Sequence, residues 1–137
     1  MKSWIACLLL LLGLVSSGGV SEAAEAAAAD RSGVILFGGT GRLGAPIARL
    51  LVAAGEPVTV FVREGSPRER LAGLQVRYVT GDLADERSIA AAFDTRPFRA
   101  AIDASAQRGA SNAVPRFYEN AATWIVRHAK RTGVRQF

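Results

Sequence analysis

The chain has 137 residues, of which half are hydrophobic and 21% are charged, so it is long and apolar enough for one domain with a core and is not a disordered composition. Its formal net charge at pH 7 is +5, but the basic residues are nearly all scattered arginines, which argues against a nucleic-acid-binding stripe. The single cysteine, Cys7, excludes a disulfide framework or a thiolate metal site within one chain.

The first 29 residues have the pattern of a leader. Lys2 supplies a positive charge, residues 4–15 form an apolar run, and residues 16–29 are small and polar with A-x-A-like cleavage sites. The apolar run is too short to span a bilayer comfortably. We therefore expect a signal peptide and linker over residues 1–29, an exported or periplasmic protein without a stable membrane span, and a folded domain over residues 30–137. Two alternatives stay open: an uncleaved membrane anchor, or a misassigned start site and a cytoplasmic protein.

The first predicted strand, residues 34–37, runs into a glycine-rich turn and then a helix. Its glycines fit both G-x-G-x-x-G, starting at Gly39, and G-x-x-G-x-x-G, starting at Gly38. Glycines let the backbone approach a pyrophosphate, and the helix N-terminus offers free N–H groups and about half a positive charge. In this context the pattern predicts a dinucleotide-phosphate site, and the alternative is a tight turn without a ligand. The predicted site residues are Gly38, Gly39, Thr40, Gly41, Arg42, Leu43 and Gly44.

Predicted strands and helices alternate along the rest of the chain. Strands are expected at residues 58–62, 76–79 and 100–104, and residues 134–137 resemble the entry to a fifth strand. Helices are expected at residues 42–54, 68–72, 86–93 (capped by Asp85) and 115–131, with polar loops at 63–67 and 107–114. This order predicts an α/β fold with a doubly wound parallel sheet, whose ligand lies at the carboxyl ends of the strands.

Arg63 follows the strand at residues 58–62, where NAD-binding proteins place an acid on the ribose 2′-hydroxyl. An arginine accommodates a 2′-phosphate instead, so the sequence favours NADP, and Arg42 in the glycine turn could help. Glu64 comes next and keeps NAD possible. The alternative is that Arg63 is a solvated loop charge.

Two other strand ends carry candidate cofactor contacts. Asp82 could accept a hydrogen bond from an adenine amino group, or serve only as a turn residue. Ser105 and Gln107 could line the nicotinamide side, or be ordinary loop residues.

No catalytic residue and no metal ligand is assigned. The only histidine, His128, is interpreted as a structural residue in the middle of a helix. A catalytic tyrosine of reductase type needs a lysine four residues on, but Asp82 follows Tyr78 and Ala122 follows Tyr118 at that spacing.

Several stretches resemble the extended and atypical short-chain dehydrogenase/reductases. Residues 35–44 look like their cofactor turn, and residues 58–63 are similar to their second strand with its NADP-selecting arginine. Gly81-Asp82-Leu83 resembles the turn where their aspartate and the next backbone N–H meet adenine, and residues 120–137 resemble the helix that leads into their fifth strand. The nearest subset is that of the NmrA-like and biliverdin-reductase-B-like NAD(P)H-binding proteins.

The resemblance implies cofactor contacts at Asp82, Leu83, Ala104 and Ser105, beside the glycine turn and Arg63. In the family, the Tyr-x-x-x-Lys pair and the substrate-binding part follow the fifth strand, so this chain would be the incomplete cofactor half of an NADPH-dependent oxidoreductase or of an NAD-dependent epimerase/dehydratase-like protein. The alternatives are a non-catalytic NAD(P)H-binding sensor and an inactive gene fragment. Its fourth strand, or a stub of the fifth, would present an unpaired apolar edge prone to aggregation. The sequence names neither a substrate nor an oligomeric state.

Overall fold

The computed structural model of the chain describes residues 32–106 and 116–137. The predicted leader over residues 1–29, the predicted loop over residues 107–114 and the candidate residue Gln107 lie outside the described residues.

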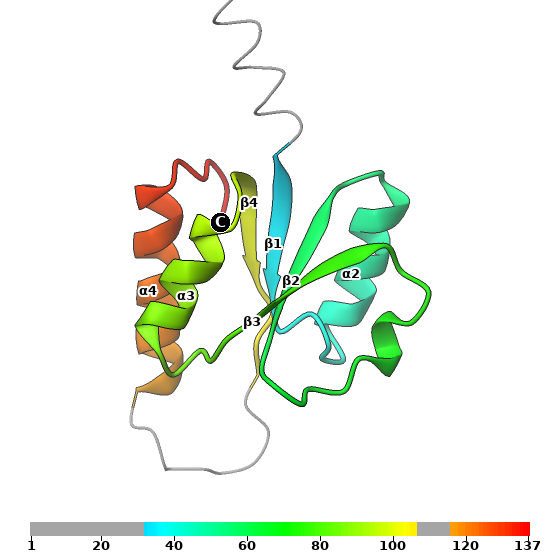
Figure 1. Cartoon of the computed structure of the whole chain (residues 1–137), viewed down its shortest axis with the longest axis horizontal. Coiled ribbons are helices and arrows are strands. Elements are labelled where there is room, and N and C mark those ends of the chain that lie inside the picture. Colours follow the sequence, from blue (N-terminus) through cyan, green and yellow to red (C-terminus); the bar gives the residue numbers. More distant parts are fainter. Residues whose placement is uncertain (1–31, 107–115) are drawn as a thin grey trace, which may run out of the picture.

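Parallel strands form one sheet in the order β3-β2-β1-β4, with helices on both faces (Figure 1). The strands are β1 (Gly33–Phe37), β2 (Val58–Val62), β3 (Val76–Thr80) and β4 (Phe98–Asp103). One face carries the helix α2 (Gly44–Ala53) and the short 3₁₀ helix η1 (Glu69–Leu71), and the other carries α3 (Glu86–Asp94) and α4 (Phe117–Arg131). This is the doubly wound α/β fold that the alternation of elements predicted.

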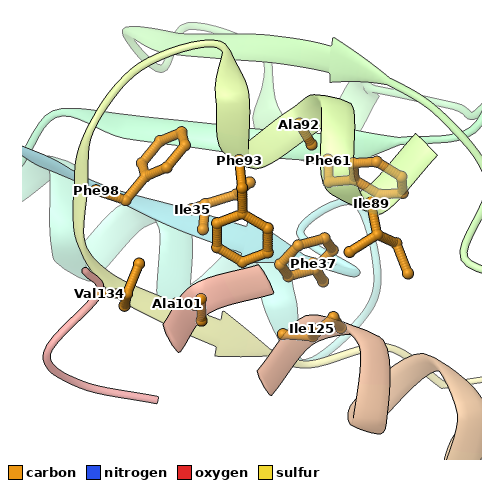
Figure 2. Packing of buried hydrophobic residues seen from close by; sticks show 11 residues of the cluster. Ile35, Phe37, Phe61, Ile89, Ala92, Phe93, Phe98, Ala101, Ile125 and Val134 are labelled. Carbon is orange, nitrogen blue, oxygen red and sulfur yellow. The ribbon is translucent and has the colours of Figure 1, made fainter. Parts of the chain in front are cut away.

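β1 lies in the middle of the sheet and is buried along its whole length, as is β2. Successive side chains of β1 point into the two cores on opposite faces of the sheet. A strand in this position therefore needs consecutive apolar residues. Figure 2 shows the core between the sheet and the α3–α4 layer, where Phe37 lies 5.1 Å from Phe61 and 5.8 Å from Phe93 between ring centroids. On the opposite face, Leu36 packs in a second cluster with residues of β2 and α2 and with Leu71 of η1. The glycine turn therefore directly follows a strand that is packed on both faces.

Several predicted boundaries differ from the observed ones by one or two residues, and two of the differences have a clear physical cause. α2 begins at Gly44 rather than at residue 42, because residues 41–43 still belong to the turn, in which Gly41 N–H donates to the Gly38 carbonyl (2.9 Å). β4 runs from Phe98 to Asp103 rather than from 100 to 104, since its pairing with β1 already starts at Gly33 and Phe98. The predicted cap of α3 is confirmed, as the Asp85 carboxylate accepts from Arg87 N–H at 3.0 Å.

The residues after α4 return to the sheet beside β4. Arg135 N–H donates to the Arg99 carbonyl (3.1 Å), and Ala101 N–H donates to the Gln136 carbonyl (2.9 Å). This is a single parallel bridge rather than a strand. It agrees with the expected approach to a fifth strand position, and it pairs part of the β4 edge that the sequence interpretation had left open.

A search of the helices in residues 32–106 and 116–137 found none that is both long and apolar enough to cross a membrane.

Candidate functional site

A cleft of about 660 Å³ opens at the carboxyl ends of the strands. These strand ends point to the lower side of the sheet in Figure 1. The cleft lies where the strand order switches between β1 and β4, which is where open α/β sheets bind their ligands. Most of the predicted site residues line it: Gly38, Thr40, Gly41, Arg42, Leu43, Arg63, Asp82, Leu83, Ala104 and Ser105. The fold thus gathers four separate stretches of the chain around one cleft.

The glycine turn starts at Gly38, which needs to be glycine for two reasons. Its backbone has φ +72°, a conformation that other residues rarely adopt. A Cβ atom at Gly38 would also lie 2.6 Å from the Ala104 carbonyl oxygen and 2.6 Å from the Ser105 Cα. The turn after β1 and the segment after β4 therefore lie against each other with no space for a side chain between them.

Gly39 and Gly44 were predicted to belong to the site, but neither lines the cleft. They instead allow close packing behind it. A Cβ atom on Gly39 would lie 2.6 Å from Val60 Cγ1, and one on Gly44 would lie 2.6 Å from the Gly39 Cα. The lack of a side chain at Gly44 therefore lets α2 lie directly against the turn, and the lack of one at Gly39 lets the turn lie against β2.

The N-terminus of α2 has the features of an anion site. Its cap residue, Leu43, makes no side-chain hydrogen bond to the helix, and the first turn carries no acidic residue. The first N–H groups are thus left without a capping side chain, at the end of the helix that carries partial positive charge. Leu43 is also 65% exposed, which is unusual for a leucine and leaves it open to contact with a ligand.

Three arginines line the cleft: Arg42, Arg63 and Arg70. Within residues 32–106 and 116–137 none of them is ion-paired with a carboxylate, whereas Arg99 pairs with Glu56. Glu64, which had kept NAD open as a cofactor, does not line the cleft. The cleft lining therefore carries three arginines without an ion pair in these ranges, together with the carboxylates of Asp82 and Asp103.

Asp82 is a turn residue, which is one of the two roles that the sequence left open, because its Oδ1 accepts from Ala84 N–H at 2.9 Å. It also lines the cleft beside Leu83, and its contact with adenine stays a prediction. At the end of β4, Asp103 Oδ1 accepts from Ser105 N–H at 2.9 Å. Within residues 32–106 and 116–137, the hydroxyl oxygen of Ser105 is buried and has no hydrogen-bond partner.

Sequence reasoning missed several residues that line the cleft: Phe61, Val62, Ser66, Arg70, Asp103, Ala106 and Phe117. Asp103 could have been identified from the sequence, because it is an acidic residue at the end of an apolar strand. Arg70 could not, because its orientation depends on how η1 packs on α2.

The histidine and the tyrosines stay outside the cleft lining. His128 joins α4 to α3, with Nε2 3.2 Å from Glu86 Oε1 and Nδ1 accepting from Arg131 Nε at 3.2 Å. Tyr78 lies under the Arg68 guanidinium, 4.3 Å from the ring centroid. Among the residues that the structure describes, no group of three or more His, Cys, Asp or Glu side chains is placed to hold a metal ion.

These features fit an elongated anionic dinucleotide. The glycine turn and the uncapped α2 N-terminus suit its diphosphate, the arginines after β2 and in the turn suit an acidic adenosine end, and Ser105 offers a polar atom at the opposite side of the cleft. Among residues 32–106 and 116–137, no tyrosine, histidine or metal-holding group lines the cleft.

Comparison with known proteins gives the same result. A family described as NAD(P)H-binding matches residues 38–137. Sterol demethylase protein B of Methylococcus capsulatus is 35% identical over 104 residues, which cover 74% of this chain and 32% of that protein. The chain thus spans about a third of the length of this relative.

Solved structures share the fold. WbmG of Bordetella bronchiseptica, in complex with NAD and UDP, has a TM-score of 0.65 and 19% identity, over 74% of this chain and 34% of that one. ChuY, an anaerobillin reductase from Escherichia coli O157:H7, has a TM-score of 0.57 and 26% identity, over 75% of this chain and 47% of that one. With its Rossmann-like sheet and its match over residues 38–137, the chain belongs to the family described as NAD(P)H-binding, and its cofactor is a nicotinamide dinucleotide.

Proposed function

We propose that this chain forms the cofactor-binding half of an NADPH-dependent oxidoreductase. The observation that carries the proposal is the charge at the end of β2. Arg63 lines the cleft where NAD-binding relatives place an acid, and Glu64 does not line it. A carboxylate at this position repels a 2′-phosphate, whereas an arginine binds it with charge-assisted hydrogen bonds.

The remaining residues would hold the dinucleotide along the cleft. The turn from Gly38 to Gly44 would hold the diphosphate, Asp82 and the N–H of Leu83 the adenine, and Ala104 with Ser105 the nicotinamide side. Arg42 would assist Arg63 at the 2′-phosphate. The bound cofactor supplies hydride, and the protein positions it.

A non-catalytic sensor of NADPH is the second candidate. Neither Tyr78 nor Tyr118 has a lysine four residues on, so the chain does not supply the tyrosine–lysine pair of the reductases. An oxidoreductase would need its proton donor from another part of the full-length protein or from the substrate. The 35% identity to a sterol demethylase protein makes sterols the first substrate class to test.

The proposal is tested by titrating the protein with NADPH and with NADH and following the nicotinamide fluorescence. We expect tighter binding of NADPH. Equal affinities would refute the 2′-phosphate site, and no binding of either cofactor would refute the whole proposal. Oxidation of bound NADPH by a sterol ketone would then favour the oxidoreductase, and stable binding with every substrate tested would favour the sensor.

We also propose export through the leader, which is supported by the pattern of residues 1–29 alone. N-terminal sequencing of the protein from its natural cells would then find a mature chain that begins between about residues 24 and 30. An intact N-terminus in the cytosolic fraction would refute export.

A further inference from the structure

A second cleft lies near the amino ends of β2 and β3. It has a volume of about 640 Å³, a size that small molecules occupy in proteins. Its lining includes Thr59 and Arg77, the second residues of these two strands, and Thr95 and Arg96, which follow α3. It shares no lining residue with the cofactor cleft. The two clefts are therefore separate and lie toward opposite ends of the strands.

A buried hydroxyl group belongs to the lining of this second cleft. Thr59 is only 1% exposed, and in the part of the chain that the structure describes its Oγ1 has no hydrogen-bond partner. The side chain lies on the same face of the sheet as Phe61, toward α3, whereas Val58 points into the opposite core. A valine at position 59 would fill nearly the same space without an unpaired polar atom. Packing alone therefore does not explain the threonine.

Two arginines give the second cleft a positive charge. Arg77 is paired with Thr59 in the parallel register of β2 and β3, so both side chains lie on the same face of the sheet. Arg96 follows α3 and is half-buried. Among the described residues, no aspartate or glutamate lines this cleft, and neither arginine is in an ion pair. The cleft therefore combines two cations and a hydroxyl donor without an acid to neutralise them.

Two negative groups at the end of α3 are already engaged by other residues. Asp94, the last residue of α3, is ion-paired with Arg131 of α4 at 2.8 Å. The Ala92 carbonyl oxygen accepts a hydrogen bond from the Thr95 hydroxyl at 2.7 Å, which reduces the repulsion that a helix C-terminus exerts on an anion. The end of α3 therefore does not cancel the charge of the two arginines.

We propose that the second cleft is a ligand site that binds a small phosphate monoester. The phosphate accepts hydrogen bonds from the guanidinium groups of Arg77 and Arg96 and from the Thr59 hydroxyl, and its charge of about −1.5 to −2 near neutral pH balances both arginines. A carboxylate carries a single charge and leaves one arginine unbalanced. A cleft of this size has room for more than a phosphate ion, so the organic part of the ester lies beside Val79 and Pro97. Because the two clefts share no lining residue, this site can exist whichever nucleotide the other cleft binds.

The experiment is a calorimetric titration of the protein with glycerol 3-phosphate, inorganic phosphate and acetate. Amide NMR shifts recorded during the same titrations locate the bound ligand without any use of a nucleotide. The variants are Arg77→Gln, Arg96→Gln and Thr59→Val. Arg87→Gln is the control for the loss of one positive charge, because Arg87 is exposed on α3 and lines neither cleft. Thermal melting checks that each variant is folded.

We expect glycerol 3-phosphate to bind more tightly than inorganic phosphate or acetate, with amide shifts at Arg77 and Arg96. Arg77→Gln and Arg96→Gln should each raise its Kd by about 10-fold or more, as the loss of a hydrogen bond between charged groups predicts. Arg87→Gln should change the Kd by less than about twofold, because solvent and salt screen a distant exposed charge. Thr59→Val should weaken binding and raise the Tm of the ligand-free protein, since it removes an unpaired buried hydroxyl. A purely structural role for Thr59 would leave the Kd unchanged.

Other results would overturn the site or its ligand. The absence of heat and of amide shifts with all three ligands would refute the site. Equal binding of acetate would exclude a phosphate site, and equal binding of inorganic phosphate would exclude an ester. Amide shifts confined to residues 38–44 would place the phosphate in the cofactor cleft, and an equal loss in Arg87→Gln would indicate unspecific attraction to a basic protein. If Thr59→Val does not fold, Arg77→Gln decides, because Arg77 is exposed: an unchanged Kd in that variant would refute the site.

Discussion

Gly44 offers a test of how the turn and α2 are packed together. A Cβ atom at this position would overlap the Gly38 carbonyl oxygen and would lie 2.6 Å from the Gly39 Cα and 2.8 Å from the Gly38 carbonyl carbon. All three atoms belong to the backbone, so no side-chain rotation relieves the overlap. In Gly44→Ala, the helix must therefore move away from the turn.

The expected cost follows from this geometry. Overpacking a tight site destabilises by about 1–3 kcal/mol. For a domain of this size, each kcal/mol lowers Tm by roughly 4–8 °C. If the α2 N-terminus holds the diphosphate as proposed, moving it removes at least one charge-assisted hydrogen bond, which predicts a loss of affinity of about 10- to 150-fold. NADPH and NADH should lose affinity equally, because both carry the diphosphate.

Gly133→Ala is the matched control. Gly133 has φ +77°, but a Cβ atom there would meet no atom within 4 Å. Its replacement costs about 1–2 kcal/mol of backbone strain and lies outside the cleft lining. We expect this control to melt earlier and to bind both cofactors as before, as measured by calorimetric titration. Unchanged cofactor binding in Gly44→Ala would refute the idea that packing of α2 on the turn builds the diphosphate site.

Three further changes probe other parts of the chain. Arg63→Gln should raise the Kd for NADPH by about 10- to 150-fold and leave NADH nearly unchanged in the same titration, and an equal loss for both cofactors would contradict the 2′-phosphate assignment. Phe93→Ala should cost about 3–5 kcal/mol in urea unfolding, because Phe93 is 2% exposed and packs on Phe37, and an unchanged midpoint would be incompatible with the packing in Figure 2. Asp85→Ala should cost about 0.5–2 kcal/mol through loss of the α3 cap, whereas Asp85→Asn, which keeps an acceptor, should unfold close to the original midpoint.

Local patterns were sufficient to predict most of the fold. The β-branched run that became β2 was predicted with its observed bounds, and Asp85 was identified as a cap, because both depend on neighbouring residues. The beginning of α2 was placed too early because helical periodicity does not register a turn whose hydrogen bonds come before the helix. β4 was misplaced because its ends are set by pairing with β1, and this register is not visible in the strand itself.

The site was predictable where a residue's position follows from the end of a strand. Arg63 comes directly after β2 and Asp82 comes two residues after the end of β3, so topology alone brings them to the same edge as the glycine turn. Arg70 was not predictable in this way. Its direction depends on Leu71 entering the core and on the Arg49 hydrogen bond, which are both tertiary contacts.

The enclosure of β1 bears on how cofactor choice can change between related proteins. The turn that would receive the diphosphate continues from a strand with no exposed residue, so its donors are preorganised and little conformational entropy is lost when a ligand arrives. The arginines that would bind the 2′-phosphate of the adenosine ribose are exposed side chains at the rim of the cleft. A switch between the two nicotinamide cofactors therefore requires only surface substitutions, which leave the buried scaffold and its stability intact.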